Sequence, residues 1–243
     1  MHNNLLDEIA PTGVLRAAIN MSNFLLVTGE TETGEPDGVS PDIARAIAKR
    51  LGVECKLIPF SGPGELADAV ADDVWDIGNI AAEPERARTI TFSPAYCEIQ
   101  ATYLLPADSA IQNIDEVDTK GYRIAVKQRS AYDLWLSENI HHATLVKATS
   151  IDDSFQLFVR DKLEALAGLR PKLLEQQKML TGSRVLNDSF TAIRQSIGCQ
   201  PGRNATAVFL KDFVEQSITN GLIESLINKH GVQGKLSVAP LSL

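Results

Sequence analysis

Residues 76–88 of this 243-residue chain are DIGNIAAEPERAR, and residues 89–96 continue as TITFSPAY. The apolar run at 76–80 predicts a short buried strand, and small residues after it lead into a Pro-Glu-Arg turn. This order places backbone N–H groups and the guanidinium of Arg86 at the C-terminal end of a strand. Arginine's planar fork can hold a carboxylate through two parallel hydrogen bonds. We therefore expect Arg86 to bind a carboxylate; the alternative is an arginine solvated on the surface.

Hydrophobic periodicity predicts alternating strands and helices along the whole chain. In the first half, strands are expected at 15–20, 55–60 and 76–80, and helices at 42–51 and 64–71. In the second half, strands are expected at 122–126, 143–148 and 163–168, and helices at 131–139 and 151–160. Each series predicts a mostly parallel sheet flanked by helices, so the fold class is α/β.

Two such series predict two lobes joined by extended strands. We expect the chain to cross at 101–105 and to return at 193–198. The first lobe is then 1–103 plus 196–243, and the second is 104–195. In open α/β sheets the ligand lies beyond the C-terminal ends of the strands. Two facing sheets joined by a two-strand hinge would therefore close around a ligand, which indicates capture and not chemistry.

The motifs also resemble the signature of the family 3 solute-binding proteins, the polar amino-acid receptors of ABC transporters. DGVSPDIARAIAKRLG at 37–52 is similar to the family's first helix, and GYRIAVKQRSA at 121–131 to the strand and loop opening its second lobe. The resemblance covers about residues 12–231. It implies a periplasmic-binding-protein-like type II fold, a small-molecule carboxylate ligand and an ABC transporter permease as partner. We expect no cofactor, no metal and no catalytic residue, because the sequence has no Walker-type loop, no Gly-x-Ser-x-Gly elbow and no metal-ligand spacing.

The resemblance also implies ligand contacts at the end of the motif strand. Arg86 corresponds to the family residue that binds the ligand carboxylate. The candidate set is completed by three residues that precede Arg86 in the same segment: Asn79, Ala81 and Glu83.

In the family, the loop after the first strand contacts the ligand side chain. Here the candidates are Asn20, Asn23 and Phe24. The acidic position of the family is occupied by Asn20, which disfavours a basic ligand side chain. Ordinary turn formation is the alternative for both asparagines, and core packing is the alternative for Phe24.

The loop at 127–133 is expected to open the first helix of the second lobe. Backbone N–H groups at a helix N-terminus favour an anion. The candidates are Arg129, Ser130 and Ala131, and Ser130 is also a candidate helix N-cap, which is a compatible role. Arg129 stands where the family usually has glycine.

Leu169 stands where the family's receptors usually place an aspartate that pairs with the ligand's α-ammonium. A buried ammonium without that carboxylate would keep its desolvation cost and lose its partner. We therefore expect a ligand that is not a basic amino acid and need not be a standard α-amino acid. The neighbouring Arg170 is either a second cation facing the ligand or a structural residue.

The net charge of −8 and the pI near 5.1 argue against a nucleic-acid partner. No apolar run approaches the ~18 residues that a membrane span requires. We also expect the protein to be a monomer. Residues 1–8 lack a secretory signal, so we expect the periplasm if a signal was removed and the cytoplasm otherwise. Three widely spaced cysteines predict buried free thiols: Cys55, Cys97 and Cys199.

Two rival functions remain open at this stage. Cyclohexadienyl dehydratases resemble these receptors, and such an enzyme would need a cleft acid, for which Glu83 is the candidate. The other rival is a cytosolic sensor or an orphan binding protein without a transporter.

Two packing predictions can also be tested by the structure. The acidic residues at 72, 73 and 76 lack the spacing of a calcium loop and are expected in a solvated turn. A helical stripe is expected to be buried, comprising Ile151, Phe155, Phe158 and Val159.

Overall fold

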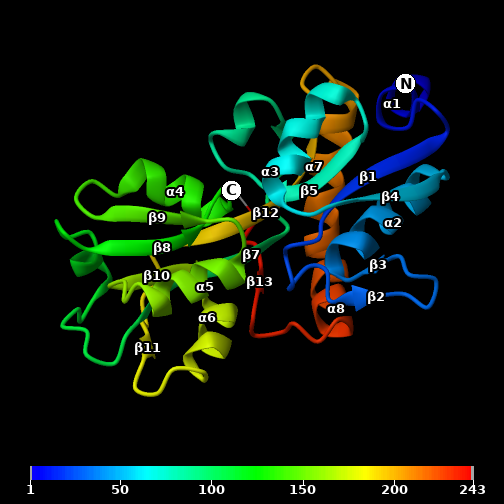
Figure 1. Cartoon of the computed structure of the whole chain (residues 1–243). Coiled ribbons are helices and arrows are strands. Elements are labelled where there is room, and N and C mark those ends of the chain that lie inside the picture. The colour runs from blue at the N-terminus through cyan, green and yellow to red at the C-terminus, as the bar shows by residue number, and fades with distance from the viewer. Residues whose placement is uncertain (1, 242–243) are drawn as a thin grey trace. The chain divides into compact units, whose positions relative to one another are not determined.

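A computed structural model describes residues 2–241, and the chain divides into two compact units (Figure 1). Unit 1 comprises Met1–Glu98 and Arg194–Leu243, and unit 2 comprises Ile99–Ile193. The chain passes between them in strand β7 (Cys97–Leu105) and strand β12 (Thr191–Cys199). The sequence placed these boundaries a few residues later. The first division falls early in β7 because this strand pairs with β13 (Ser237–Val238) at Cys97 and Glu98, and with β10 only from Ala101 onwards.

The sheet of unit 1 runs in the order β4-β1-β5-β12. Strands β4 (Glu54–Phe60), β1 (Val14–Asn20) and β5 (Ile77–Ala81) are parallel, and β12 joins antiparallel to β5. The helices are α1 (His2–Ile9), α2 (Val39–Leu51), α3 (Pro63–Asp68), α7 (Asn204–Thr219) and α8 (Leu222–Lys229). Short pieces complete the unit: β2 (Gly29–Glu30), β3 (Pro36–Asp37), β6 (Thr91–Phe92) and the 3-10 turns η1 (Ala69–Asp72) and η2 (Arg86–Arg88).

Alternate residues of β5 face opposite sides of the sheet, as strand geometry requires. Ile80 packs with Ala18, Leu66 and Trp75 in a buried cluster. Gly78 lies on that same side, since a Cβ added to it would contact the side chains of Leu66 and Trp75. Asn79 therefore points to the other side of the sheet.

The start of α2 requires a glycine. Gly38 has a φ of 149°, a conformation that L side chains rarely adopt. A Cβ there would also lie 2.3 Å from the carbonyl oxygen of Leu26. The glycine of the motif at 37–52 therefore has a steric cause.

The acidic turn of unit 1 differs from the prediction. Asp76 is fully buried, and its carboxylate accepts hydrogen bonds from the backbone N–H and guanidinium of Arg16 and from the guanidinium of Arg203. Asp73 is exposed but also pairs with both arginines. Asp72 and Asp73 are thus both exposed, as the prediction expected. The solvated-turn prediction is wrong for Asp76 because its partners lie 60 and 127 residues away in the sequence.

The sheet of unit 2 runs in the order β7-β10-β8-β9. Strands β8 (Arg123–Lys127), β9 (Thr144–Ala148) and β10 (Ala165–Leu169) are parallel, whereas β7 is antiparallel to β10. The helices are α4 (Ala131–Asn139), α5 (Ile151–Arg160) and α6 (Arg170–Gln177), with a 3-10 turn η3 (Ile114–Val117) and a short strand β11 (Arg184–Val185) that pairs with β7. The predicted strands and helices of both units are confirmed, with ends shifted by a few residues.

The core of unit 2 lies under α5 and α6. Phe155 and Phe158 of α5 and Leu173 of α6 pack with Leu166 of β10 and Ala125 of β8. Figure 1 shows α4 on the other side of these strands. The predicted stripe is confirmed at Phe155 and Phe158, half-buried at Ile151 and wrong at its last residue. Val159 is 41% exposed, and Leu157 packs against the core instead.

The three cysteines are free thiols. Cys97 and Cys199 are buried and Cys55 is half-buried. Burial raises the pKa of Cys55 and of Cys199 to about 11, so both stay protonated near neutral pH.

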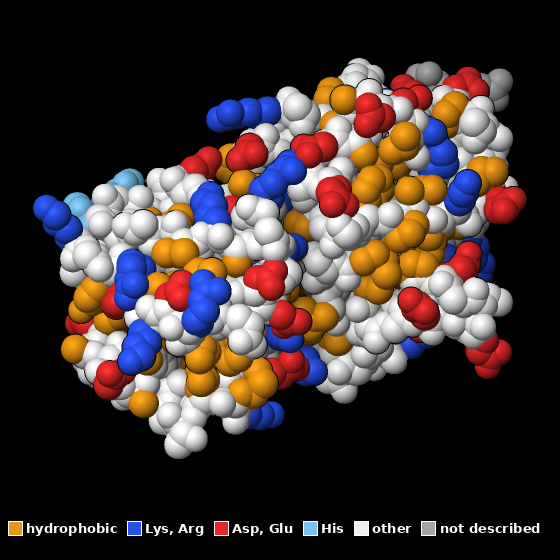
Figure 2. Space-filling model, in the orientation of Figure 1, with side chains coloured by type: hydrophobic (Ala, Val, Ile, Leu, Met, Phe, Trp, Pro, Cys, Tyr) orange, Lys and Arg blue, Asp and Glu red, His pale blue; other side chains and the backbone are white. Residues whose placement is uncertain are grey.

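Two observations concern the length of the helices and the distribution of charge on the surface. Among the described residues, none of the helices combines the length and the apolar character that crossing a membrane demands. On the face drawn in Figure 2, acidic side chains lie among the basic ones. Such a mixture is unlike the dense basic surface that phosphate recognition requires.

Candidate functional site

Arg86 lies in the turn that follows the C-terminal end of β5. It opens the 3-10 turn η2, and its side chain is 95% buried. Its Nη1 donates a hydrogen bond of 3.0 Å to the carbonyl oxygen of Ala81, the last residue of β5. The guanidinium is therefore tied to the end of the strand and is not a solvated surface group. Arg88, two residues further on, is exposed.

The sequence predicted backbone N–H groups at this strand end beside the guanidinium of Arg86, but two of these groups are used within the protein. The N–H of Ala82 donates to the carbonyl of Arg194 at 3.1 Å, and the N–H of Glu83 donates to the carbonyl of Ala81 at 3.1 Å. Both donors are used within unit 1. The positive charge at this strand end comes from the side chain of Arg86. Glu83, three residues earlier in the sequence, is also buried.

Asn79 of β5 carries an unsatisfied amide. Its side chain is 2% exposed, and neither its nitrogen nor its oxygen has a hydrogen-bond partner. A buried amide without partners loses its hydration and gains nothing in return, which costs on the order of 1–3 kcal/mol. Such groups in a native structure call for an explanation, and a bound polar molecule is one.

The loop after β1 forms a turn through its own side chains. Oδ1 of Asn20 accepts hydrogen bonds from the N–H and the hydroxyl of Ser22. Oδ1 of the buried Asn23 accepts from the N–H of Leu25 at 3.2 Å. Phe24 between them is half-buried. Both asparagines thus serve the turn-forming role that the sequence left open.

In unit 2, the turn between β8 and α4 has the features of an anion site. Ser130 is the N-cap of α4: its Oγ accepts from the N–H of Asp133 at 3.1 Å and donates to the carbonyl of Lys127 at 2.8 Å. Ala131 is the first helical residue, and N–H groups in the first turn of a helix lack intrahelical partners. The positive end of the helix dipole lies at the same place.

Arg129 adopts a left-handed backbone conformation, with a φ of 58°. This gives a physical reason for glycine at the corresponding position of the family, because glycine alone adopts this conformation without cost. Here a carboxylate supports the turn instead. Oδ2 of Asp133 accepts the N–H of Arg129 at 2.6 Å.

Asp133 is a functional candidate that sequence analysis missed. Its side chain is 2% exposed, and Oδ1 pairs with Nζ of Lys147 on β9 at 2.9 Å. The signal was present as Ser130-x-x-Asp133, the pattern of a capping box. The carboxylate fixes the turn that carries the anion-site candidates.

Arg170 is used within unit 2. Its Nε donates to Oε1 of Gln100 at 2.7 Å, and its two terminal nitrogens donate to the carbonyls of Leu186, Asn187 and Asp188. These bonds hold the start of α6 to the segment that leads into β12. They favour the structural alternative, so we leave Arg170 out of the proposed ligand contacts. Leu169 is the N-cap of α6 and brings no polar side chain.

Comparison with known proteins places these features in context. Residues 17–233 match the model of a family described as bacterial extracellular solute-binding proteins, family 3. The L-cystine-binding protein TcyJ of Escherichia coli (strain K12) is 23% identical over 93% of this chain and 85% of its own length. The glutamine-binding protein of Geobacillus stearothermophilus is 24% identical over 80% of this chain and 76% of its own length.

Solved structures show the same fold. The solute receptor for L-cysteine of Neisseria gonorrhoeae has a TM-score of 0.77 at 17% identity, covering 97% of this chain and all of that one. The ancestral amino acid-binding protein AncCDT-1, a precursor of cyclohexadienyl dehydratase, has a TM-score of 0.73 at 22% identity, covering 92% and 98%. These likenesses confirm the periplasmic-binding-protein-like type II fold class.

Proposed function

Because this chain belongs to the bacterial extracellular solute-binding proteins of family 3, we propose that it captures a small carboxylate-bearing metabolite for an ABC transporter. The observation that carries the carboxylate part is the position of Arg86. Arg86 is 95% buried and its guanidinium is hydrogen-bonded to the end of β5, so it is held in place before any ligand arrives. Preorganised donors bind an anion without the cost of ordering a flexible side chain.

The proposed ligand contacts are divided between the two units. In unit 1 they are Arg86 for the carboxylate and the unsatisfied amide of Asn79 for a further polar group. In unit 2 they are the hydroxyl of Ser130 and the first N–H groups of α4, with Arg129 beside them. The turn-forming asparagines after β1 and the half-buried Phe24 stay as proposed contacts of the ligand side chain.

We propose that binding closes the two units about the chain crossings in β7 and β12. A ligand shifts a conformational equilibrium only by its difference in affinity for the two states. A molecule held by groups from both units would bind the closed state more tightly than the open state. The named relatives bind cystine, glutamine and cysteine, so capture without turnover is the function proposed here, in the extracytoplasmic compartment that the family's description indicates.

The ligand class is proposed from the charges near the candidate residues. Among them, Arg86 and Arg129 are cationic and Glu83 is acidic, whereas Asn20 and Leu169 stand where the family usually has acids. A basic amino acid would bring a second cation to these groups. We therefore propose a neutral or acidic ligand, which includes acids without a free α-ammonium.

A thermal-shift panel tests this proposal, because a ligand that binds only the folded state raises its melting temperature by mass action. The panel contains cystine, glutamine, dicarboxylates and N-acylated acids on one side, and lysine, arginine and histidine on the other. We expect stabilisation from the first group alone. Stabilisation by a basic amino acid, with no response to the others, would overturn the ligand class. Product formation from a prephenate-like acid would instead support the dehydratase alternative through Glu83.

A further inference from the structure

Unit 2 contains a cavity of about 530 Å³ that belongs to none of the sites described so far. It is lined by four segments: residues 106–111, Tyr122, residues 158–164 at the end of α5, and residues 180–183. Its size is within the range of ~300–1,000 Å³ that small-molecule sites occupy.

The cavity lies at the opposite edge of the sheet from the Ser130 turn. Tyr122 immediately precedes β8, and Glu164 immediately precedes β10, so the cavity opens at the N-terminal ends of these parallel strands. The Ser130 turn follows the C-terminal end of β8. Because a five-residue strand spans about 16 Å, the length of β8 separates the cavity from the Ser130 turn.

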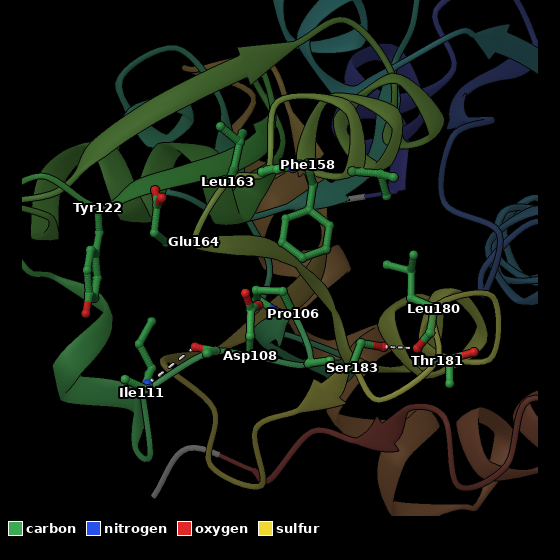
Figure 3. A pocket seen from close by; sticks show the side chains of 15 residues that line it. Pro106, Asp108, Ile111, Tyr122, Phe158, Leu163, Glu164, Leu180, Thr181 and Ser183 are labelled. Atoms are coloured by element: carbon green, nitrogen blue, oxygen red, sulfur yellow. Dashed lines mark hydrogen bonds between the residues drawn. The ribbon is translucent and has the colours of Figure 1, made fainter.

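The floor of the cavity is apolar. Phe158, Leu163 and Ile111 are each 3% exposed, and the first two belong to the core cluster of unit 2. Figure 3 shows the ring of Phe158 between the segment that carries Pro106 and Asp108 and the side that carries Leu163 and Glu164. Above this floor, the lining exposes apolar surface at Val159, which is 41% exposed, and at the half-buried Leu180. This surface offers contact area to an aromatic or branched apolar group.

The walls are fixed by hydrogen bonds. The guanidinium of Arg184 on β11 donates to the carbonyls of Ser109 and Ile111. Oγ of Ser109 accepts the N–H of Ile111 at 3.3 Å, and Oγ of Ser183 donates to the carbonyl of Leu180 at 2.7 Å (Figure 3). The cavity is therefore formed before a ligand enters, which lowers the ordering cost of binding.

The lining carries one available charge of each sign. The carboxylate of Glu164 is neutralised by Arg123, with oxygen to nitrogen distances of 2.9 and 3.1 Å. Asp108 and Lys162 are exposed, and neither side chain makes an ion pair among the described residues. They belong to different segments of the lining, the first to residues 106–111 and the second to the turn between α5 and β10.

We propose that this cavity is a second binding site, for a zwitterion with an aromatic or branched apolar body. The body packs against Val159 and Leu180 above the floor that Phe158 and Leu163 form, the ammonium faces Asp108, and the carboxylate faces Lys162. Neither the fold of the family nor the carboxylate site proposed above requires this site, and its test does not depend on Arg86.

The probe is L-phenylalanine, compared with its amide, which lacks the anion, and with its N-acetyl derivative, which lacks the cation. Binding is followed by amide chemical shifts in the Arg86→Ala variant, so that the Arg86 site does not contribute. We expect saturable shifts confined to residues 106–111, 162–164 and 180–183, with a dissociation constant on the order of 1 mM. Absence of saturable shifts in these segments would overturn the proposal.

Two charge variants assign the ends of the ligand. Asp108→Asn should weaken phenylalanine and its amide about threefold and leave the N-acetyl derivative unchanged. Lys162→Asn, which tolerates the left-handed backbone at this position, should weaken phenylalanine and the N-acetyl derivative and leave the amide unchanged. The matched controls are Asp115→Asn and Lys120→Asn, which are exposed and outside the lining. Equal effects of control and lining variants would refute the charge assignment.

A cavity-filling variant locates the ligand independently. Ala110 is an exposed lining residue, so Ala110→Trp fills the opening without disturbing the core. We expect it to abolish the shifts while the melting temperature is retained. Unchanged affinity in this variant would show that the probe binds elsewhere and would overturn the proposal.

Discussion

Replacing Asp76 with asparagine should destabilise unit 1 far more than the same change at Asp72. Asp76 is fully buried, and its two oxygens accept four hydrogen bonds, at distances between 2.8 and 3.2 Å. Three donors belong to Arg16 and one to Arg203. The substitution keeps the size of the side chain but places an NH2 group against N–H donors, and it leaves the guanidinium groups of Arg16 and Arg203 with the exposed Asp73 in place of their buried charge partner.

The magnitude follows from these contacts. Breaking one partner of a buried ion pair costs about 3–5 kcal/mol, and the oxygen that asparagine retains recovers part of it. We expect a loss of about 3 kcal/mol in the free energy of unfolding. With a urea m-value of roughly 3 kcal/mol/M for a chain of this size, the midpoint should fall by about 1 M.

The assay is urea unfolding followed by tryptophan fluorescence. The chain has two tryptophans, of which Trp75 is buried in unit 1 next to the substituted residue and Trp135 lies in unit 2. In a Trp135→Phe background, the fluorescence reports unit 1 alone. Asp72→Asn is the matched control, because this residue is exposed, and it should shift the midpoint by less than about 0.2 M. Equal shifts for the two variants would refute the role of the Asp76 cluster.

Three further predictions concern the unit 2 turn, pH and closure. Asp133→Asn removes the charge that holds the N–H of Arg129, so ligand affinity should fall about tenfold by calorimetry; an unchanged affinity would exclude a positioning role. The hydrogen bond from Arg123 lowers the pKa of Glu164 below its ordinary 4.5, so its stabilising contribution is present above pH 4.5 and is lost as pH falls through the lower folded value. Between pH 5 and about 3, the melting temperature of a Glu164→Gln variant should therefore fall less steeply than that of the wild type. If the two melting temperatures fell in parallel, the contribution of the Glu164 carboxylate to stability would be contradicted. Closure should reduce the radius of gyration in small-angle scattering when ligand saturates the protein, and an unchanged radius would argue against it.

The sequence predicted the features that depend on local order. The DIGNIAAEPERAR segment placed Arg86 at the end of a strand because a buried strand and a turn are encoded by adjacent residues. The N-cap role of Ser130 was also visible, since capping depends on residues three positions apart.

Features that depend on distant residues were not predictable in the same way. Asp76 appeared to belong to a solvated turn because its partner Arg203 comes from the start of α7, 127 residues later. Arg170 is used by carbonyl groups 16 to 18 residues away, whose direction is set by the approach to β12. The cavity of unit 2 is lined by four separate segments, so no single stretch of sequence predicts it.

The central claim is that Arg86 binds the carboxylate of a captured solute. Its most direct test is calorimetric titration of the best ligand from the thermal-shift panel into the wild type, Arg86→Ala and Arg88→Ala, the last being an exposed arginine two residues away. Truncating one partner of a buried charge pair costs about 2–4 kcal/mol, so Arg86→Ala should weaken binding roughly 30- to 1,000-fold. Arg88→Ala should leave the affinity within about twofold. Equal affinities for wild type and Arg86→Ala, with both proteins folded, would contradict the account.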